Sequence, residues 1–281
     1  MINFDKIKIE VEGTGIIANS ASLSTSASLA DIKSVGKIGT FNQIPSGPKT
    51  SFLQFSYLID MNKEPNLIIA DEIKNTLNDL SYLTPTISIG GVSGQGYLSS
   101  FSLNGNPNSP IQANVNYTIF DELSGYLQES ETVESGDFVD RSIAHGWGLV
   151  VNTVSGYREE PALNFSYNLQ NVWRPTYSVG QSNPIQVNLD GSNEVVSLTQ
   201  SDYEFIQYSG ENVEGVLLDS SNPTIQLKDI NLACAGNGID LLQETGNMKT
   251  FNLEGSKITA NQFGVTIDNI AKTTYTIRKS H

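Results

Sequence analysis

The amino-acid sequence predicts a mainly β protein: two β-sandwich or barrel-like domains with long hairpins, and one helix in the first domain. Residues 111–119 alternate apolar and polar side chains, which is typical of a strand with one buried and one wetted face. An Asn-, Gly- and Pro-rich segment precedes this strand, so residues 97–120 are expected to form a long hairpin. Only 16% of the residues are charged, while Gly, Ser, Asn and Thr are plentiful, a balance that favours strands and turns.

The length of the chain, 281 residues, exceeds that of one typical domain. The segment 123–136 is acidic, contains Gly and Ser, and shows no clear periodicity. Residues 123–142 are therefore expected to link a first domain over 1–122 to a second domain over 143–281.

The first half is expected to contain short strands and the single helix. Pro65 and an apolar stripe at helical spacing, ending near Leu80, predict a helix over residues 65–80. Residues 21–29 are compatible with either a strand or an extended arm, and residues 42–48 have the composition of a turn. The other strands expected here are 6–12, 52–59 and 86–89.

The second half shows the same pattern of short strands and turns. Asp190-Gly191 between apolar runs predicts a tight hairpin, and Trp173-Arg174-Pro175 predicts a break. The expected strands are 149–154, 162–169, 185–189, 194–199, 224–230, 249–253, 262–267 and 275–278.

Two short similarities indicate an internal duplication. At an offset of 144, residues 34–37 (Ser-Val-Gly-Lys) match 178–181 (Ser-Val-Gly-Gln), and Gly47 falls on Gly191, after which the strands need a one-residue shift. At an offset of 150, residues 100–105 match 250–255 and the parity of the buried face is kept. The shared element order predicts two pseudo-equivalent β-domains, although the helix has no obvious partner in the second.

The net charge of −14 is spread over long stretches that lack cations. No Lys or Arg occurs between Lys74 and Arg141, or between Arg174 and Lys228, where many carboxylates lie. This distribution argues against binding a nucleic-acid backbone, which requires clustered cations. It is compatible with ordinary solvated surface or with a surface that repels polyanions.

The sequence offers no recognisable motif for catalysis, cofactor binding or metal binding. Cys234 is the single cysteine and is expected to be a small buried side chain, and His145 and His281 are the only imidazoles. Residues 90–96 lack the last glycine of both a nucleophile elbow and a dinucleotide loop, so a glycine-rich turn is expected there. The N-terminus has no basic region followed by an apolar one, and no apolar run reaches the roughly 18 residues of a membrane helix. A soluble protein made in a cytoplasm is expected.

Four segments resemble the tail tube protein family of tailed bacteriophages. They are the Ser-rich residues 20–28, the Val35-Gly36 turn, residues 42–48 (Asn-Gln-Ile-Pro-Ser-Gly-Pro) and the strand 52–57. The resemblance covers most of residues 13–120 and, more loosely, 162–278. It implies a non-enzymatic virion structural protein whose long strands join edge to edge into a barrel around a central channel.

For a two-domain member, the resemblance implies trimeric or hexameric rings stacked into a tail tube, through which DNA passes without specific binding. It also implies contacts with other tail proteins, assembly in the host cytoplasm, a final place in the virion tail, and no membrane. In such a tube an acidic lumen is expected to let DNA slide. The lumen would be lined by Gln112, Asn114, Asn116 and Thr118, while Ile111, Val115 and Tyr117 pack against the sandwich.

Three alternatives stay open at this point. One is a different structural role, such as another tail part, a head-tail joining protein or a capsid decoration protein. Another is a carbohydrate-binding adhesin that uses exposed aromatics such as Trp147, Trp173 and Tyr167 and does not polymerise, although such aromatics more often belong to a core or an interface. The third is a hydrolase with unrecognised carboxylates, which would need a concave site with convergent acids.

Overall fold

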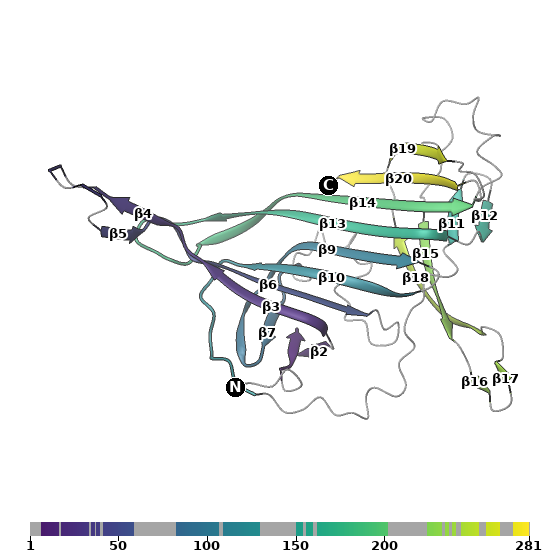
Figure 1. The fold of residues 1–281 in the computed structure, drawn as a ribbon, viewed down its shortest axis with the longest axis horizontal. Coiled ribbons are helices and arrows are strands. Elements are labelled where there is room, and N and C mark those ends of the chain that lie inside the picture. The colour runs from purple at the N-terminus through teal and green to yellow at the C-terminus, as the bar shows by residue number, and fades with distance from the viewer. Residues whose placement is uncertain are drawn as a thin grey trace.

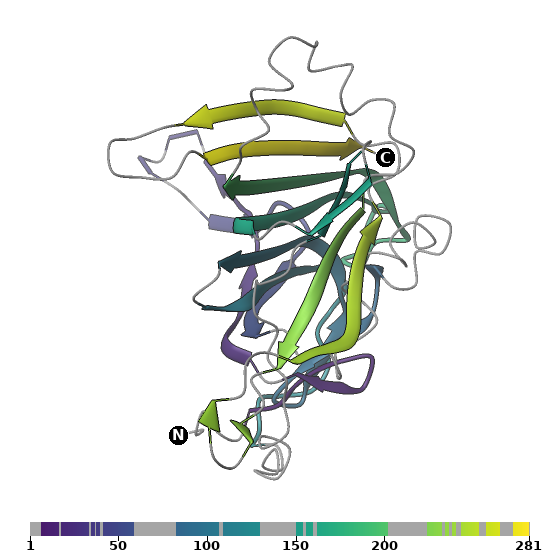
Figure 2. The same cartoon turned by 90° about the vertical axis from the view of Figure 1, so that its right-hand side faces the viewer.

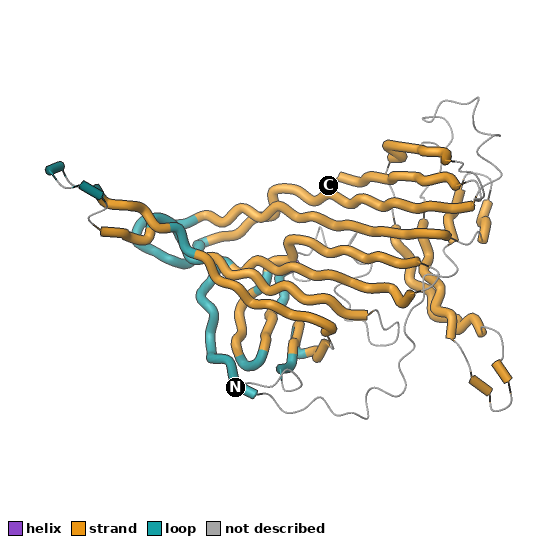
Figure 3. The backbone as a smooth tube through the Cα atoms, viewed as in Figure 1, coloured by secondary structure: helices purple, strands orange, loops and turns teal. Residues whose placement is uncertain are grey.

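The computed structural model describes residues 7–16, 18–33, 35–36, 38–39, 42–58, 83–106, 109–129, 150–153, 156–159, 162–201, 224–231, 234–235, 238–239, 243–252, 257–264 and 272–280. This backbone consists of strands joined by loops and turns (Figure 3). The prediction of a mainly β protein is confirmed. The helix predicted at 65–80 lies outside the described residues, as does most of the predicted linker.

One eight-stranded antiparallel sheet runs through the molecule in the order β19-β20-β14-β13-β9-β10-β6-β3 (Figure 1). Four of its strands come from each half of the chain, and the pairing of β9 with β13 joins the halves. The sheet therefore crosses the predicted domain boundary, and the division into two domains stays a prediction. Its strands are β3 (Ala18–Ser26), β6 (Thr50–Leu58), β9 (Tyr97–Asn106), β10 (Ser109–Ile119), β13 (Ala162–Thr176), β14 (Gln186–Ser201), β19 (Lys257–Gly264) and β20 (Lys272–Ser280).

Two four-stranded sheets accompany the large one, in the orders β2-β1-β7-β8 and β12-β11-β15-β18. In both views β15 and β18 run steeply across the strands of the large sheet (Figures 1 and 2). The strands of these two small sheets are β1 (Ile9–Val11), β2 (Thr14–Ile16), β7 (Thr86–Ile89), β8 (Val92–Gln95), β11 (Val150–Thr153), β12 (Gly156–Glu159), β15 (Thr224–Asn231) and β18 (Gln243–Asn252). Two short hairpins, β4 (Leu29–Ile32) with β5 (Asn42–Pro45) and β16 (Cys234–Ala235) with β17 (Gly238–Ile239), complete the described elements.

The hydrophobic core lies between the first small sheet and one face of the large sheet. Ile9, Val11 and Ile87 from the small sheet pack in one buried cluster with Phe55 and Val115 from the large one. The alternation of residues 111–119 explains this packing, because Ala113, Val115, Tyr117 and Ile119 are all at most 3% exposed. Burial of this apolar surface is the main favourable contribution to folding.

The two halves of the chain have the same topology. When the strands are taken in chain order, each sheet of the first half maps onto a sheet of the second with no change of neighbours. The equivalent pairs are β1 and β11, β2 and β12, β3 and β13, β6 and β14, β7 and β15, β8 and β18, β9 and β19, and β10 and β20.

The offset of 144 describes the long hairpin of each half. The outer strands pair Ile32 with Asn42 in the first half and Thr176 with Gln186 in the second, and each partner is shifted by 144 residues. The turns that follow contain Gly36 and Gly180, with φ of 88° and 84°, a conformation that favours glycine. Strand β13 thus corresponds to β3 together with β4, and strand β14 corresponds to β5 together with β6.

The second predicted offset, 150, is wrong, and the register gives 160 instead. In β9 a bulge skips Ser99, so that Asn116 pairs with Ser100 and Tyr117 with Leu98. In β19 the bulge skips Thr259 in the same way, 160 residues further on, between the pairs Thr276–Ala260 and Ile277–Ile258. Residues 250–252 lie on β18, which corresponds to β8 rather than to β9.

Three predicted turns or breaks are also wrong. Asp190-Gly191 does not close a hairpin: β14 continues through it, with an irregularity between Val172 and Trp173 on the partner strand. Residues 42–45 form β5 because they pair with β4. Strand β13 continues through Pro175 beyond Gln170, where its pairing with β9 ends, and a proline is tolerated where a strand lacks a second neighbour.

Candidate functional site

The large sheet has a second face, opposite the core, that carries small polar side chains across all eight strands. Strand register places these residues side by side, for example Ser20, Ser56, Asn114, Ser102 and Asn168 in one row. We call this surface the polar face. Its described members include Ser20, Ser22, Ser24, Phe52, Gln54, Ser56, Leu58, Gln112, Asn114, Asn116, Thr118, Ser100, Ser102, Asn104, Asn164, Ser166, Asn168, Gln170, Val172, Arg174, Asn193, Val195, Ser197, Thr199, Lys272, Thr274, Thr276, Arg278 and Gln262.

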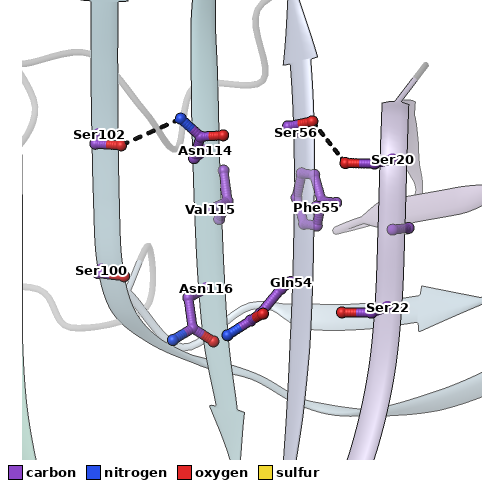
Figure 4. A pocket seen from close by; sticks show the side chains of 11 residues that line it. Ser20, Ser22, Gln54, Phe55, Ser56, Ser100, Ser102, Asn114, Val115 and Asn116 are labelled. Atoms are coloured by element: carbon purple, nitrogen blue, oxygen red, sulfur yellow. Dashed lines mark hydrogen bonds between the residues drawn. The ribbon is translucent and has the colours of Figure 1, made fainter.

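A hollow of about 410 Å³ lies on the polar face over β3, β6, β10 and β9 (Figure 4). Across it, the hydroxyls of Ser20 and Ser56 share a hydrogen bond of 2.8 Å, and the Asn114 amide donates to the Ser102 hydroxyl at 3.4 Å. The side chains that line the hollow include no His, Lys, Cys, Asp or Glu, so none of them can act as the base that would activate a serine hydroxyl for nucleophilic attack.

The polar face carries few charges. By strand parity it includes Arg174 on β13 and Lys272 and Arg278 on β20, and Arg174 is paired with the Asp190 carboxylate at 2.7 Å. The expectation of an acidic lumen stays a prediction, since this face, in its described part, is polar rather than acidic. Hydroxyls and amides interact with water but give phosphates no fixed positive charge to pair with.

The seam between β9 and β13 joins the halves through buried contacts on the core face. Tyr167 is fully buried, and its ring lies 6.1 Å from that of Phe101, measured between centroids. Its hydroxyl donates a hydrogen bond of 3.1 Å to Glu194 Oε2, a carboxylate that is itself only 2% exposed. A buried carboxylate needs such donors. The seam is therefore held both by the packing of aromatic rings and by a buried hydrogen bond.

Side chains continue the seam where the ladder of backbone pairs ends. The β9–β13 pairing stops at Ser100, next to the bulge. Beyond it the carbonyl oxygen of Leu98 accepts hydrogen bonds from Asn171 Nδ2 at 2.9 Å and from Trp173 Nε1 at 2.8 Å. The Trp173 ring also contacts Tyr97 edge-on, with centroids 5.3 Å apart. Tyr167 and Trp173 are thus seam residues and not an exposed carbohydrate platform.

The ends of the two long hairpins carry most of the exposed apolar surface. Over the described residues, eight of the ten exposed large hydrophobic side chains lie on β4–β5, on the outer part of β13–β14, or at their turns. Both hairpins extend from the same end of the large sheet (Figure 1). These eight are Leu29, Ile32, Val35, Ile38, Ile44, Val172, Val179 and Ile185.

The remaining candidates from the sequence do not gather into a site. Gly90 and Gly91 form the two-residue turn between β7 and β8, with φ of 54° and 87°, as expected for a tight hairpin. His145, His281 and Trp147 lie outside the described residues, and so does the side chain of Cys234. Among the described residues, no cluster of His, Cys, Asp and Glu has the arrangement of a metal site, and no helix is long and apolar enough to span a membrane.

No protein-family model matches the chain, and no curated protein matches it. Function is therefore inferred from the residues and their geometry. The pairing of β9 with β13 carries no local signal in the sequence. The polar face does have a local signal in the sequence, because polar residues at even positions recur along β3, β9, β10 and β13.

Two buried tyrosines make the fold sensitive to alkaline pH. Burial raises the pKa of Tyr117 and of Tyr167, with a further contribution from Glu12 and Glu194 respectively. A raised pKa in the folded state stabilises the fold below pH 10, the ordinary value, and this stability is lost as the pH rises above it. We expect the free energy of unfolding to fall by about 1.4 kcal/mol per tyrosine for each pH unit above 10.

Urea unfolding at pH 8, 10 and 11 checks this dependence. The double variant Tyr117→Phe/Tyr167→Phe is the control, because it keeps both rings but cannot ionise. Its stability is expected to fall clearly less between pH 10 and 11. Equal slopes for the two proteins would contradict the assignment.

Proposed function

We propose that the chain is a non-enzymatic virion structural protein, a two-domain tail tube subunit that assembles into stacked rings and forms a conduit for DNA. The observation that carries the proposal is the duplicated eight-stranded sheet, which has one buried face, one polar face with few charges and two free edges in the described part of the chain. Such a sheet is suited to form a segment of a closed wall.

In this proposal the polar face lines the channel. A duplex that moves through a channel must not be held by its phosphates, and phosphates bind where Lys and Arg displace counterions. The polar face offers mainly hydroxyls and amides instead, and its cations are few: Lys272 and Arg278 on β20, and Arg174, which is paired with Asp190. DNA is expected to pass without specific binding.

The size of the sheet supports a ring of three chains. Neighbouring strands lie about 4.8 Å apart, and strands in barrels tilt by about 40°. Three chains would supply 24 strands and a backbone diameter of roughly 50 Å, or about 40 Å inside the side chains. Two chains would leave only about 20 Å, too narrow for a hydrated duplex, so a trimer with six pseudo-equivalent units is the smallest suitable ring.

The hairpin ends support the stacking of rings. Exposed apolar surface gathered in one place marks an interaction site. Here it lies on two equivalent arms of one chain, each with a fully exposed valine, Val35 or Val179. Because the strands of the large sheet run toward these arms, contacts made by the arms would extend the wall along its axis (Figure 1).

The remaining parts of the proposal follow from the tube. Partners would be further copies of the chain and other tail proteins, and the site of function would be the virion tail after assembly in the host cytoplasm, without a membrane. An initiator, terminator, adaptor, head-tail joining or decoration role would use the same fold in a shorter assembly. A carbohydrate-binding adhesin would instead stay monomeric.

Negative-stain electron microscopy of the purified protein over a range of concentrations, with mass determination, tests the proposal. Rings or hollow tubes with a channel a few nanometres wide are expected, and the ring mass should be near three times the 30.5 kDa of the chain. Isolated rings that never stack would favour a terminator or joining role. A monomer at every concentration that binds a glycan in a binding screen would contradict the proposal in favour of the adhesin.

A further inference from the structure

The large sheet ends at β3 on one side and at β19 on the other, and in the described part of the chain neither strand has a second neighbour. Natural proteins usually protect such edges with charges, prolines or bulges. Strand β3 contains no charged residue and no proline, and β19 has one charge, Lys257 at its start. Each strand has a bulge, after Ala18 and after Ile258, but β13 and β9 have bulges at the equivalent positions and still pair with each other. In the described part of the chain, these two edges are therefore open to pairing with another strand.

The seam inside the chain shows what such a pairing looks like. It joins β9, the last sheet strand of the first half, to β13, the first of the second half. The free edge β19 is the equivalent of β9 at an offset of 160, and the free edge β3 is the equivalent of β13 at an offset of 144. The two outer edges of the sheet are thus the equivalents of the two strands that already pair with each other inside the chain.

We propose that β19 of one copy pairs antiparallel with β3 of the next copy, in the register of the internal seam. Within the chain, Leu103 lies opposite Tyr167 and Ser102 opposite Asn168. Shifting these positions by 160 and 144 residues places Phe263 opposite Leu23 of the next copy, Gln262 opposite Ser24, and Asn261 opposite Thr25. This interface rests on the proposed ring assembly and gives it a specific geometry.

The register keeps the faces of the sheet continuous. Ser24 and Gln262 are both exposed members of the polar face, so their pairing extends its rows from one copy to the next. A slip of one residue would place polar side chains on the core face. The pairing is head-to-tail, since it uses two different surfaces, and such contacts close into a ring when the rotation between copies permits.

The incomplete burial of side chains on β3 and β4 supports the proposal that a further strand covers this edge in the assembly. Leu23 is only partly buried and Leu29 is 58% exposed, although their counterparts at the seam are Tyr167, fully buried, and Trp173, packed against the core. Strand β3 therefore has the exposure expected of β13 if β9 were removed. A second copy placed on this edge by the seam geometry would cover both leucines.

A disulfide between copies tests the register. The variant Ser24→Cys/Gln262→Cys, in a Cys234→Ala background, is oxidised after assembly and run on a non-reducing gel. Opposed residues lie about 5 Å apart, within reach of a disulfide, so covalent dimers and closed rings are expected. In the matched control Ser20→Cys/Gln262→Cys, the cysteines are about 13 Å apart, and at least about tenfold less cross-linking is expected.

The outcomes separate this interface from the proposed function. Rings or tubes seen by microscopy without the Ser24–Gln262 cross-link would overturn the register and leave the tube proposal standing. Equal cross-linking of the control pair would also overturn the register. A chain that stays monomeric at every concentration and forms neither cross-link would overturn both.

Discussion

The variant Tyr167→Ala is expected to lower the free energy of unfolding by about 3–5 kcal/mol, the range for removing a large buried aromatic side chain. The side chain is fully buried at the seam, where its ring packs on Phe101. Its loss leaves a cavity and removes the hydroxyl that donates to Glu194. Urea unfolding followed by far-UV circular dichroism measures the change.

The control Tyr167→Phe keeps the ring and removes only the hydroxyl. It is expected to cost about 1–3 kcal/mol, because the buried Glu194 carboxylate loses one donor. A loss below about 1 kcal/mol for Tyr167→Ala would show that the seam contributes little to stability.

The shared sheet also bears on how the wild-type chain unfolds. Two domains joined only by a linker would give two transitions, whereas a sheet and core that cross between the halves favour one. Circular dichroism and the fluorescence of Trp173, which contacts Tyr97 at the seam and is measured in a Trp147→Phe background, are expected to change together. In Tyr167→Ala they are expected to separate.

Local pattern was enough to predict much of the first half of the sheet. The alternation of residues 111–119 correctly assigned the buried side chains Ala113, Val115, Tyr117 and Ile119, and β7 has the predicted bounds 86–89. These predictions succeed because side chains alternate between faces along any strand, whatever its neighbours. The predominance of hydroxyl and amide side chains on the polar face could also have been recognised from the even-numbered residues of β3, β9, β10 and β13.

The failed predictions concern interactions between distant residues. Asp190-Gly191 is a strong turn signal, but β14 pairs along the whole length of β13, and the turn residues are absorbed as an irregularity. The offset of 150 was suggested by Phe101 and Phe251, yet the register makes Asn261 the counterpart of Phe101. Local likeness was misleading there because the duplicated strands have diverged in their side chains.

The variant Val35→Asp/Val179→Asp is expected to form rings that no longer stack into tubes. Both valines are fully exposed at the hairpin turns, outside the seam strands β9 and β13 and outside the edge strands β3 and β19. In a stacked tube each would lose about 1.5–3 kcal/mol of apolar burial, and each aspartate would have to leave water without a partner. Six such turns per trimeric ring multiply the effect, so tube length should collapse to single rings.

Two controls separate loss of apolar contact from added charge. Val35→Ala/Val179→Ala removes apolar area without charge and is expected to shorten tubes. Gln95→Glu/Gln128→Glu adds the same two carboxylates at exposed positions away from the hairpin ends and is expected to leave tube length unchanged. Normal tubes from Val35→Asp/Val179→Asp would mean that the hairpin ends do not form the axial contact. Loss of rings as well would mean that they contribute to closure, because a head-to-tail wall with intact edges should still close without axial neighbours.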